Sequence, residues 1–328
     1  MHRRSALLPL LTLATASVTL FAAGGARAEA AGRPKPVQHA AADSAAERRQ
    51  VTTYWTERRM EAAQPLDAPA PDGVAKPSQG TPFTAPPTGA RGGGLEPWAA
   101  RSSGAAWTGG GAVTRTTGRI FFTTQGRNAS CSGTAVTSAN KSVVLTAGHC
   151  VRLNGAFHTN WVFVPGYAAG RRPFGTWPAT RLLTTRQWNA SEDANFDVAA
   201  AVVAPLEGRT LVDVVGGQGV AFNQRRRQQM YAFGYPAVAP YDGSKLVYCN
   251  GRTFDDHLLT DDHGLTCDMT GGSSGGPWLL NFNASTGLGT QNSVNSFKYN
   301  STPDWMFGPY FGNEVQSVYQ AAQSTNAL

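Results

Sequence analysis

The sequence predicts an all-β fold, a sandwich or a barrel, for the last two thirds of a 328-residue chain. From about Gly111 onward, short apolar runs alternate with Gly, Asn and Pro, which are residues that form turns. Only the stretch Gly312–Ser324 near the C-terminus has clear helical character. Many short strands separated by turns are typical of antiparallel sandwiches and barrels, so we expect an all-β domain that ends in a helix.

The first 28 residues predict an export signal. Basic residues at positions 3 and 4 precede an apolar run over 6–23, and a small-residue pattern ends at Ala28. A transmembrane anchor is the alternative for this run. No later stretch approaches the roughly 20 apolar residues that a membrane-spanning helix needs. We therefore expect cleavage after Ala28 and a secreted protein that has no membrane partner once the signal is removed.

Residues 29–105 predict a propeptide. They are rich in Ala, Pro, Gly and charged residues and poor in large apolar residues, so they lack a core of their own. The stretch Ala41–Ala63 has helical character, and the residues that follow it have the composition of a linker. A disordered spacer is the alternative interpretation of this segment.

Eight apolar runs after residue 111 predict strands. They combine β-branched, aromatic and aliphatic residues and are bounded by turn residues. They are Arg119–Thr124, Ser142–Ala147, Trp161–Tyr167, Phe196–Val203, Met230–Tyr235, Leu246–Cys249, Pro277–Phe282 and Ser293–Tyr299.

The net charge of +7 suggests a nucleic-acid partner, but the distribution of charge argues against one. From Ala106 onward the chain has 16 basic and 13 acidic residues, so part of the excess belongs to the N-terminal segments. The dense basic run at 225–227 has no aromatic residues interleaved with it, and we interpret it as a solvated loop. We expect no nucleic-acid partner.

Four cysteines in an exported chain predict two disulfides rather than a metal site. No two of them form a CxxC pair, and the residues alone allow three pairings. The polar stretch Phe254–Gly264 holds His257 and His263 among four aspartates, which is the composition of a metal cluster. We interpret that stretch as an exposed polar loop and expect neither a metal ion nor a cofactor.

The stretch TCDMTGGSSGGPW, Thr266–Trp278, predicts a serine nucleophile. A serine hydroxyl needs an adjacent base, usually a histidine that a carboxylate orients, and glycine N–H groups can stabilise the oxyanion. The same stretch also matches G-x-S-x-G, the nucleophile elbow of α/β-hydrolases. In that fold the histidine follows the serine, and no histidine follows Ser274 in this chain. The lipase or esterase interpretation therefore fails.

Three motifs in the order His, Asp, Ser resemble those of the chymotrypsin-like serine peptidases. They are TAGHC around His149, FDVAAAVV around Asp197 and GGSSGGPW around Ser274. The resemblance covers the chain from about Gly111 to the C-terminus. It implies a protease domain at 106–328, with one Greek-key β-barrel at about 111–215, a second at about 216–310, and a helix at about 312–324.

The resemblance also implies a role for each motif. His149 is the general base and acid, Asp197 orients it, and Ser274 is the nucleophile. The N–H groups of Gly272 and Ser274 form the oxyanion hole. Asp193, four residues before Asp197, is the competing carboxylate, but Asp197 opens an apolar run as the strand-edge aspartate of the family does.

In the family, a cysteine just after the histidine pairs with one on the preceding strand. This implies a bridge between Cys131 and Cys150, and it leaves Cys249 to pair with Cys267.

The residue before the nucleophile departs from the trypsin pattern. Trypsins have an aspartate there, which pairs with the new amino terminus after zymogen cleavage, whereas this chain has Ser273. An IVGG-type terminus is also absent upstream of Arg119. The chain is in this respect similar to the bacterial branch that includes glutamyl endopeptidases, and we expect other contacts to hold its nucleophile loop.

Substrate preference has two interpretations. Asp268 stands six residues before Ser274, where trypsins have their specificity aspartate, and this implies cleavage after Arg or Lys. The resemblance places Ser296 and Phe297 at the pocket wall, and Lys298 where the family often has glycine. A lysine there could neutralise Asp268 or bind an acidic side chain of the substrate, so a preference for Glu is the alternative. A purely structural role for Asp268 also stays open.

The prediction that follows is a secreted, monomeric serine endopeptidase that acts on protein or peptide substrates. The rival prediction is a protease-like binding protein that has lost its activity. The intact set of His, Asp and Ser motifs favours the enzyme.

Overall fold

The computed structural model describes residues 1–2, 35–69, 71, 73, 75–89 and 100–327. Apart from its first two residues, the predicted signal peptide lies outside the described residues, as does the glycine-rich stretch at 90–99. All elements named below belong to the unit Arg33–Leu328. Within the described ranges, no helix is long and apolar enough to cross a membrane.

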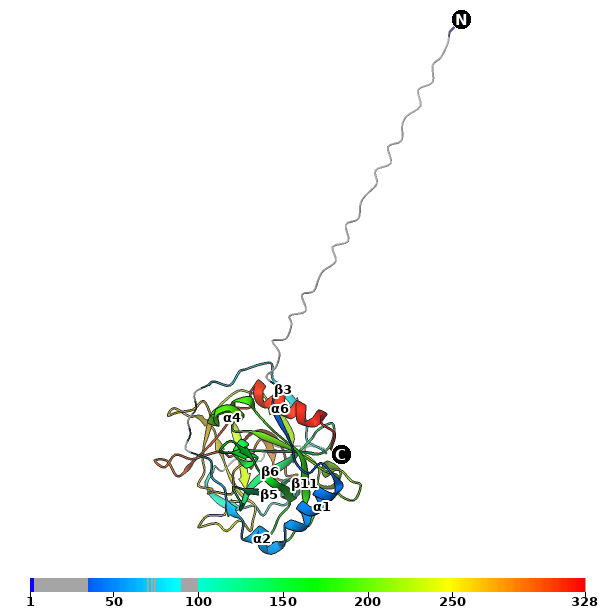
Figure 1. The fold of residues 1–328 in the computed structure, drawn as a ribbon. Coiled ribbons are helices and arrows are strands. Elements are labelled where there is room, and N and C mark those ends of the chain that lie inside the picture. Colours follow the sequence, from blue (N-terminus) through cyan, green and yellow to red (C-terminus); the bar gives the residue numbers. More distant parts are fainter. Residues whose placement is uncertain (3–34, 70, 72, 74, 90–99, 328) are drawn as a thin grey trace. The chain divides into compact units, whose positions relative to one another are not determined.

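Six strands close into a barrel around the first part of the core (Figure 1). They are β5 (Thr117–Thr124), β6 (Arg127–Val136), β7 (Val143–Thr146), β10 (Thr159–Pro165), β11 (Trp177–Thr184) and β12 (Ala199–Val203). Their order is β10-β5-β6-β7-β12, and β11 pairs antiparallel with both β10 and β12, which closes the ring. Side chains such as Ile120, Phe122 and Val144 fill it and are fully buried.

The second part of the domain is also built of strands. A seven-stranded sheet has the order β3 (Phe83–Ala85), β13 (Gly219–Phe222), β19 (Leu288–Val294), β18 (Pro277–Asn283), β14 (Gln229–Gly234), β15 (Val247–Arg252) and β4 (Arg101–Ala106). A three-stranded sheet consists of β16 (Phe254–Asp255), β17 (His263–Thr266) and β20 (Trp305–Gly308). The helix α6 (Asn313–Ser324) follows, so the predicted all-β fold with a C-terminal helix is confirmed.

Short elements connect these strands. They are α3 (Val113–Thr116), η1 (Gly148–Cys150), β8 (Arg152–Leu153), β9 (Ala156–Phe157), α4 (Arg186–Ser191), η2 (Ala194–Phe196) and α5 (Leu211–Val215). The single-turn helix η1 contains His149, and the single-turn helix η2 ends directly before Asp197.

Seven of the eight predicted runs coincide with strands, and the run Ser293–Tyr299 is the exception. There β19 ends at Val294. The backbone of Asn295 bonds instead to Gly275 and Gly276, and the peptide N–H groups of residues 296 and 297 both donate to the Phe307 carbonyl. The chain leaves the regular ladder because these carbonyls and N–H groups are already engaged by other segments.

The segment before the barrels folds onto them rather than forming a core of its own. Its elements are β1 (Val37–Ala40), α1 (Ala45–Tyr54), α2 (Glu57–Glu61) and β2 (Gln64–Pro65). Figure 1 shows α1 beside β11, and α2 packs against β6. Strand β1 pairs antiparallel with β11, and β2 pairs parallel with β6.

Local sequence explains why this segment is helical. Ser44 caps α1 in a capping box with Glu47, in which each side chain bonds the backbone N–H of the other residue. Trp55, only 1% exposed, packs on Phe121 of β5 with a ring separation of 5.5 Å. Met60 is completely buried in the same cluster. The helical character predicted for 41–63 is confirmed, and its apolar residues are stabilised by burial against the barrel.

The four cysteines form the pairs Cys131–Cys150 and Cys249–Cys267, with sequence separations of 19 and 18 residues. The first bridge joins β6 to η1, and the second joins β15 to the residue after β17. In the chain-entropy model, a bridge that closes a loop of this length stabilises the folded protein by about 3 kcal/mol. Both bridges brace segments that carry residues of the candidate site.

Candidate active site

His149 and Asp197 meet at the end of the first barrel. Strand β7 ends at Thr146, and His149 lies in the tight turn η1 that follows it. The His149 Nδ1 atom lies 2.7 Å from Asp197 Oδ2, and the His149 backbone N–H donates to Asp197 Oδ1 over 2.7 Å. Both side chains are at most 1% exposed. The carboxylate can therefore fix both the ring orientation and the tautomer, which leaves Nε2 available for chemistry.

A third group bonds the same carboxylate. The hydroxyl of Ser296 donates to Asp197 Oδ2 over 2.5 Å. The competing acid, Asp193, instead accepts from the backbone N–H groups of Asn195 and Ala75. The structure therefore brings Asp197, and not Asp193, into contact with the imidazole.

Uncharged contacts hold the loop that carries Ser274. The hydroxyl of Ser273 donates to the Thr270 carbonyl over 2.8 Å. This short bond occupies the position where a trypsin has its aspartate, and it needs no ammonium partner. The hydroxyl of Ser132, on β6, donates to the Gly272 carbonyl over 2.8 Å, and the Ser132 N–H donates to the Ser274 carbonyl over 2.7 Å.

The side chain of Asn295 also holds the loop that carries Ser274, and no sequence motif identified this residue. Its Nδ2 donates to the carbonyls of Phe233 and Ser273 over 2.8 and 2.9 Å. Its Oδ1 accepts from Trp278 Nε1 over 2.7 Å, and its backbone carbonyl accepts from the Gly275 N–H. The side chain is fully buried, so each of these bonds is shielded from water.

Gly275 shows why glycine follows the nucleophile. Its φ is +79°, a region that favours glycine. A Cβ placed there would lie 2.0 Å from Thr146 Oγ1 and 2.5 Å from the Ser132 carbonyl oxygen. Any side chain at Gly275 would push β6 and β7 away from the nucleophile loop.

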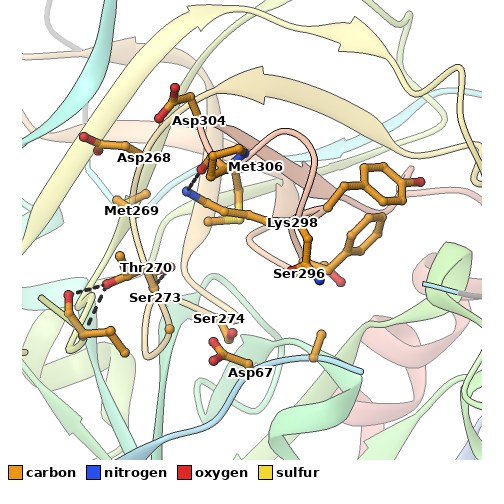
Figure 2. A pocket seen from close by; sticks show the side chains of 17 residues that line it. Asp67, Asp268, Met269, Thr270, Ser273, Ser274, Ser296, Lys298, Asp304 and Met306 are labelled. Atoms are coloured by element: carbon orange, nitrogen blue, oxygen red, sulfur yellow. Dashed lines mark hydrogen bonds between the residues drawn. The ribbon is translucent and has the colours of Figure 1, made fainter. Parts of the chain in front are cut away.

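A cavity of about 520 Å³ opens beside Ser274 (Figure 2). The four residues named for substrate binding, Asp268, Ser296, Phe297 and Lys298, all line this cavity. Asp268 Oδ1 accepts from the Gly104 N–H over 2.6 Å and from the Tyr241 hydroxyl over 2.7 Å.

Lys298 lies in the same cavity without touching Asp268. Its Nζ donates to the Pro303 carbonyl over 2.6 Å, and no ion pair within 4.0 Å joins it to Asp268 in the part of the chain that the structure describes. Burial lowers the pKa of Lys298 to about 8, while Asp268, Asp304 and Asp67 act in the opposite direction. Figure 2 shows Asp268, Lys298 and Asp304 at one end of the cavity and Asp67 next to Ser274 at the other.

The prediction of an exposed polar loop at Phe254–Gly264 is partly wrong. His257 is exposed as expected, but Asp262 and His263 are fully buried. Burial raises the pKa of Asp262 and lowers that of His263 to about 3, so for both side chains it disfavours the charged form. Sequence pattern does not reveal this burial, because it comes from packing on β20 and Tyr310, which are distant in the chain.

Cys131, His149 and Cys150 place three metal-ligand atoms within 4.8 Å of one another. Both cysteines are consumed by their disulfide, so neither can supply a thiolate. This cluster does not have the donor set of a metal site.

Comparison with known proteins identifies several relatives. No family model matches the chain. The crystal structure of protease Anisep from Arthrobacter nicotinovorans is 45% identical, with a TM-score of 0.61, over 64% of this chain and 96% of that one. The thermostable serine protease AL20 from an extremophilic microorganism is 42% identical, with a TM-score of 0.62, over 66% of this chain and all of that one.

Two weaker similarities carry less information. A Glu endopeptidase structure is 16% identical over 67% of this chain and 96% of that one, with a TM-score of 0.52, and this shows the fold alone. Among curated proteins, the extracellular metalloprotease of Bacillus subtilis strain 168 is 30% identical over 82 residues. The chain matches only a quarter of the length of that protein.

Proposed function

The chain belongs to the chymotrypsin-like serine proteases, and from this we propose that it is a secreted serine endopeptidase with a triad of His149, Asp197 and Ser274. The observation that supports the triad most directly is the double contact of Asp197 with both the ring and the backbone of His149. A carboxylate in this arrangement stabilises the imidazolium that forms when the base takes a proton.

The proposed reaction proceeds in two steps. Ser274 Oγ attacks the carbonyl carbon of the peptide while His149 Nε2 takes its proton, and the N–H groups of Gly272 and Ser274 stabilise the oxyanion. The proton then passes to the leaving amine, which departs and leaves an acyl-enzyme on Ser274. Water, deprotonated by the same nitrogen, attacks the ester and restores the serine.

A fluorophosphonate probe tests this proposal, because it labels only an activated serine. We expect labelling at Ser274 in the processed protein. The substitution Ser274→Ala should lower kcat by roughly 10⁴–10⁶, whereas Ser273→Ala should keep most of the activity because it removes only one uncharged bond. A folded, processed protein that does not label supports the rival function, a protease-like binding protein.

For specificity we propose cleavage after Arg or Lys. The lining of the cavity includes two carboxylates, Asp268 and Asp304, against one ammonium, Lys298, apart from Asp67 of the N-terminal segment. Lys298 itself favours the alternative, a preference for Glu. A cleavage profile of a peptide library separates the two, because a preference for Glu would exclude the role of Asp268 as the specificity residue.

We propose that the protein is secreted, that residues 29–105 are removed as a propeptide, and that the enzyme acts as a monomer on protein or peptide substrates. The two disulfides support secretion. N-terminal sequencing and sedimentation of the culture-medium form test these proposals.

A further inference from the structure

A segment of the N-terminal region crosses the nucleophile. It consists of Gln64–Ala68, which we call the strap. Its first two residues form β2, parallel to β6, and the Leu66 N–H continues this pairing by donating to the Ser130 carbonyl over 3.0 Å. Asp67 and Ala68 then form part of the wall of the cavity beside Ser274 (Figure 2).

The strap accepts the hydrogen bond that the Ser274 hydroxyl would donate to His149 in catalysis. The hydroxyl of Ser274 donates to the Leu66 carbonyl over 3.3 Å. His149 Nε2 is buried and has no hydrogen-bond partner among the described residues. A serine is activated when its proton is bonded to the base, and in this arrangement that proton is bonded to the strap. With the strap in place, Ser274 is only 4% exposed.

The strap does not lie as a substrate would. The carbonyl oxygen of Leu66 faces the nucleophile and accepts its proton, whereas attack requires Oγ to approach the carbonyl carbon. Within the described ranges, neither Gly272 nor Ser274 donates a backbone N–H to Leu66, so this carbonyl is not in the oxyanion hole. The strap therefore occupies the site without being placed for cleavage.

Contacts on both sides hold the strap in place. Before it, Met60 is buried in the cluster under α1 and α2. Within it, the Asp67 carboxylate lies against the bare backbone of Gly271, where an added Cβ would be 2.3 Å from Asp67 Oδ1. After it, the Ala75 N–H donates to Asp193 over 3.0 Å, and its carbonyl accepts from Asn195 over 2.8 Å.

We propose that the strap is a resident inhibitor, which binds along β6 and enters the cavity beside Ser274. The unprocessed chain is then latent, and activity requires the strap to leave. This inference rests on the proposed function, since it concerns the same nucleophile. It adds a mode of regulation that does not depend on insertion of a new amino terminus.

The rate of fluorophosphonate labelling of the unprocessed chain tests the strap. Leu66→Pro removes the N–H that bonds the Ser130 carbonyl, and losing one backbone bond should raise the labelling rate about tenfold. Leu66→Ala, which keeps the bond but removes apolar packing, should raise it less. The matched control is Lys76→Ala in the same N-terminal segment, whose exposed ion pair with Asp261 lies away from the nucleophile. It should label at the wild-type rate.

The outcomes separate the two proposals. Intact mass identifies the labelled species as unprocessed, and thermal unfolding shows whether Leu66→Pro is folded; if it is not, Leu66→Ala decides. A wild-type chain that labels as fast as the folded Leu66 variant overturns the strap and leaves the enzyme function intact. If no form labels, including the processed protein, the proposed function fails and the strap proposal fails with it.

Discussion

The substitution Asn295→Leu tests how the nucleophile loop is held without the charged pair of trypsins. Leucine has a similar volume but makes none of the three side-chain bonds to Phe233, Ser273 and Trp278. The Trp278 N–H would then be buried without a partner, and two buried carbonyls would each lose a donor. An orphaned buried group costs about 1–3 kcal/mol, so we expect a loss of about 3–5 kcal/mol in the free energy of unfolding.

Calorimetry and steady-state kinetics measure the two consequences separately. For a domain of this size the loss corresponds to a fall in Tm of about 6–20 °C. The Ser273 carbonyl loses one of its two donors and keeps only the Gly276 N–H, so the nucleophile loop is held less firmly. We therefore expect kcat of the processed enzyme to fall at least about tenfold, with a smaller change in KM. The matched control is Asn292→Leu, a buried asparagine on β19 whose Nδ2 bonds Ala221 and not the nucleophile loop. It should lower Tm and leave kcat unchanged. If Asn295→Leu lowers Tm but keeps kcat within twofold, Asn295 stabilises the domain without positioning Ser274.

Three further predictions concern charge. Ser296→Ala removes a bond to the Asp197 carboxylate and should lower kcat/KM about tenfold; an unchanged value would show that His149 and the backbone suffice to hold this acid. Asp268→Asn should reduce kcat/KM for Arg and Lys substrates more than for others in the peptide library, and an equal loss for all would assign Asp268 a structural role. Burial lowers the pKa of His158 to about 4 and of His263 to about 3, so the unfolded chain binds more protons below about pH 6.5. The free energy of unfolding should therefore fall as the pH drops from about 6.5 to about 4, and the raised pKa of Asp262 opposes part of this fall. His158→Phe should make Tm less dependent on pH. An identical pH dependence in this variant would contradict a contribution of His158 to the fall.

The sequence predicted the parts of the molecule that depend on local pattern. Apolar runs such as Val143–Thr146 located strands, and the motifs around His149 and Asp197 located two residues that the structure brings into contact. The run Ser293–Tyr299 predicts a strand that begins five residues after the start of β19, at Leu288. The sequence of β19, LGTQNSV, is mostly polar and does not show the alternation of apolar and polar residues that is typical of a strand.

The parts that were not predicted depend on contacts between distant segments. The bond between Ser274 and Leu66 joins residues 208 positions apart, and a linker-like composition does not reveal it. Asn295 holds the nucleophile loop only because the fold brings Phe233 of β14 and Trp278 of β18 within hydrogen-bond distance of its side chain. The burial of Asp262 and His263 has the same origin, since it depends on β20 rather than on neighbouring residues.

Because β4 pairs with β15, the position at which the N-terminal segment is cleaved decides which donors bond Asp268 in the mature enzyme. Gly104, on β4, donates one of the two hydrogen bonds that hold Asp268 Oδ1. A cut before Arg101 leaves this donor in the mature enzyme, whereas a cut after Gly104 takes it away and leaves Tyr241 as the remaining donor to that oxygen. In the second form Asp268 Oδ1 has one acceptor position free, and we expect it to bond a cationic substrate side chain there. The same chain could then yield enzymes of different selectivity, with the choice made by whichever protease trims its amino terminus.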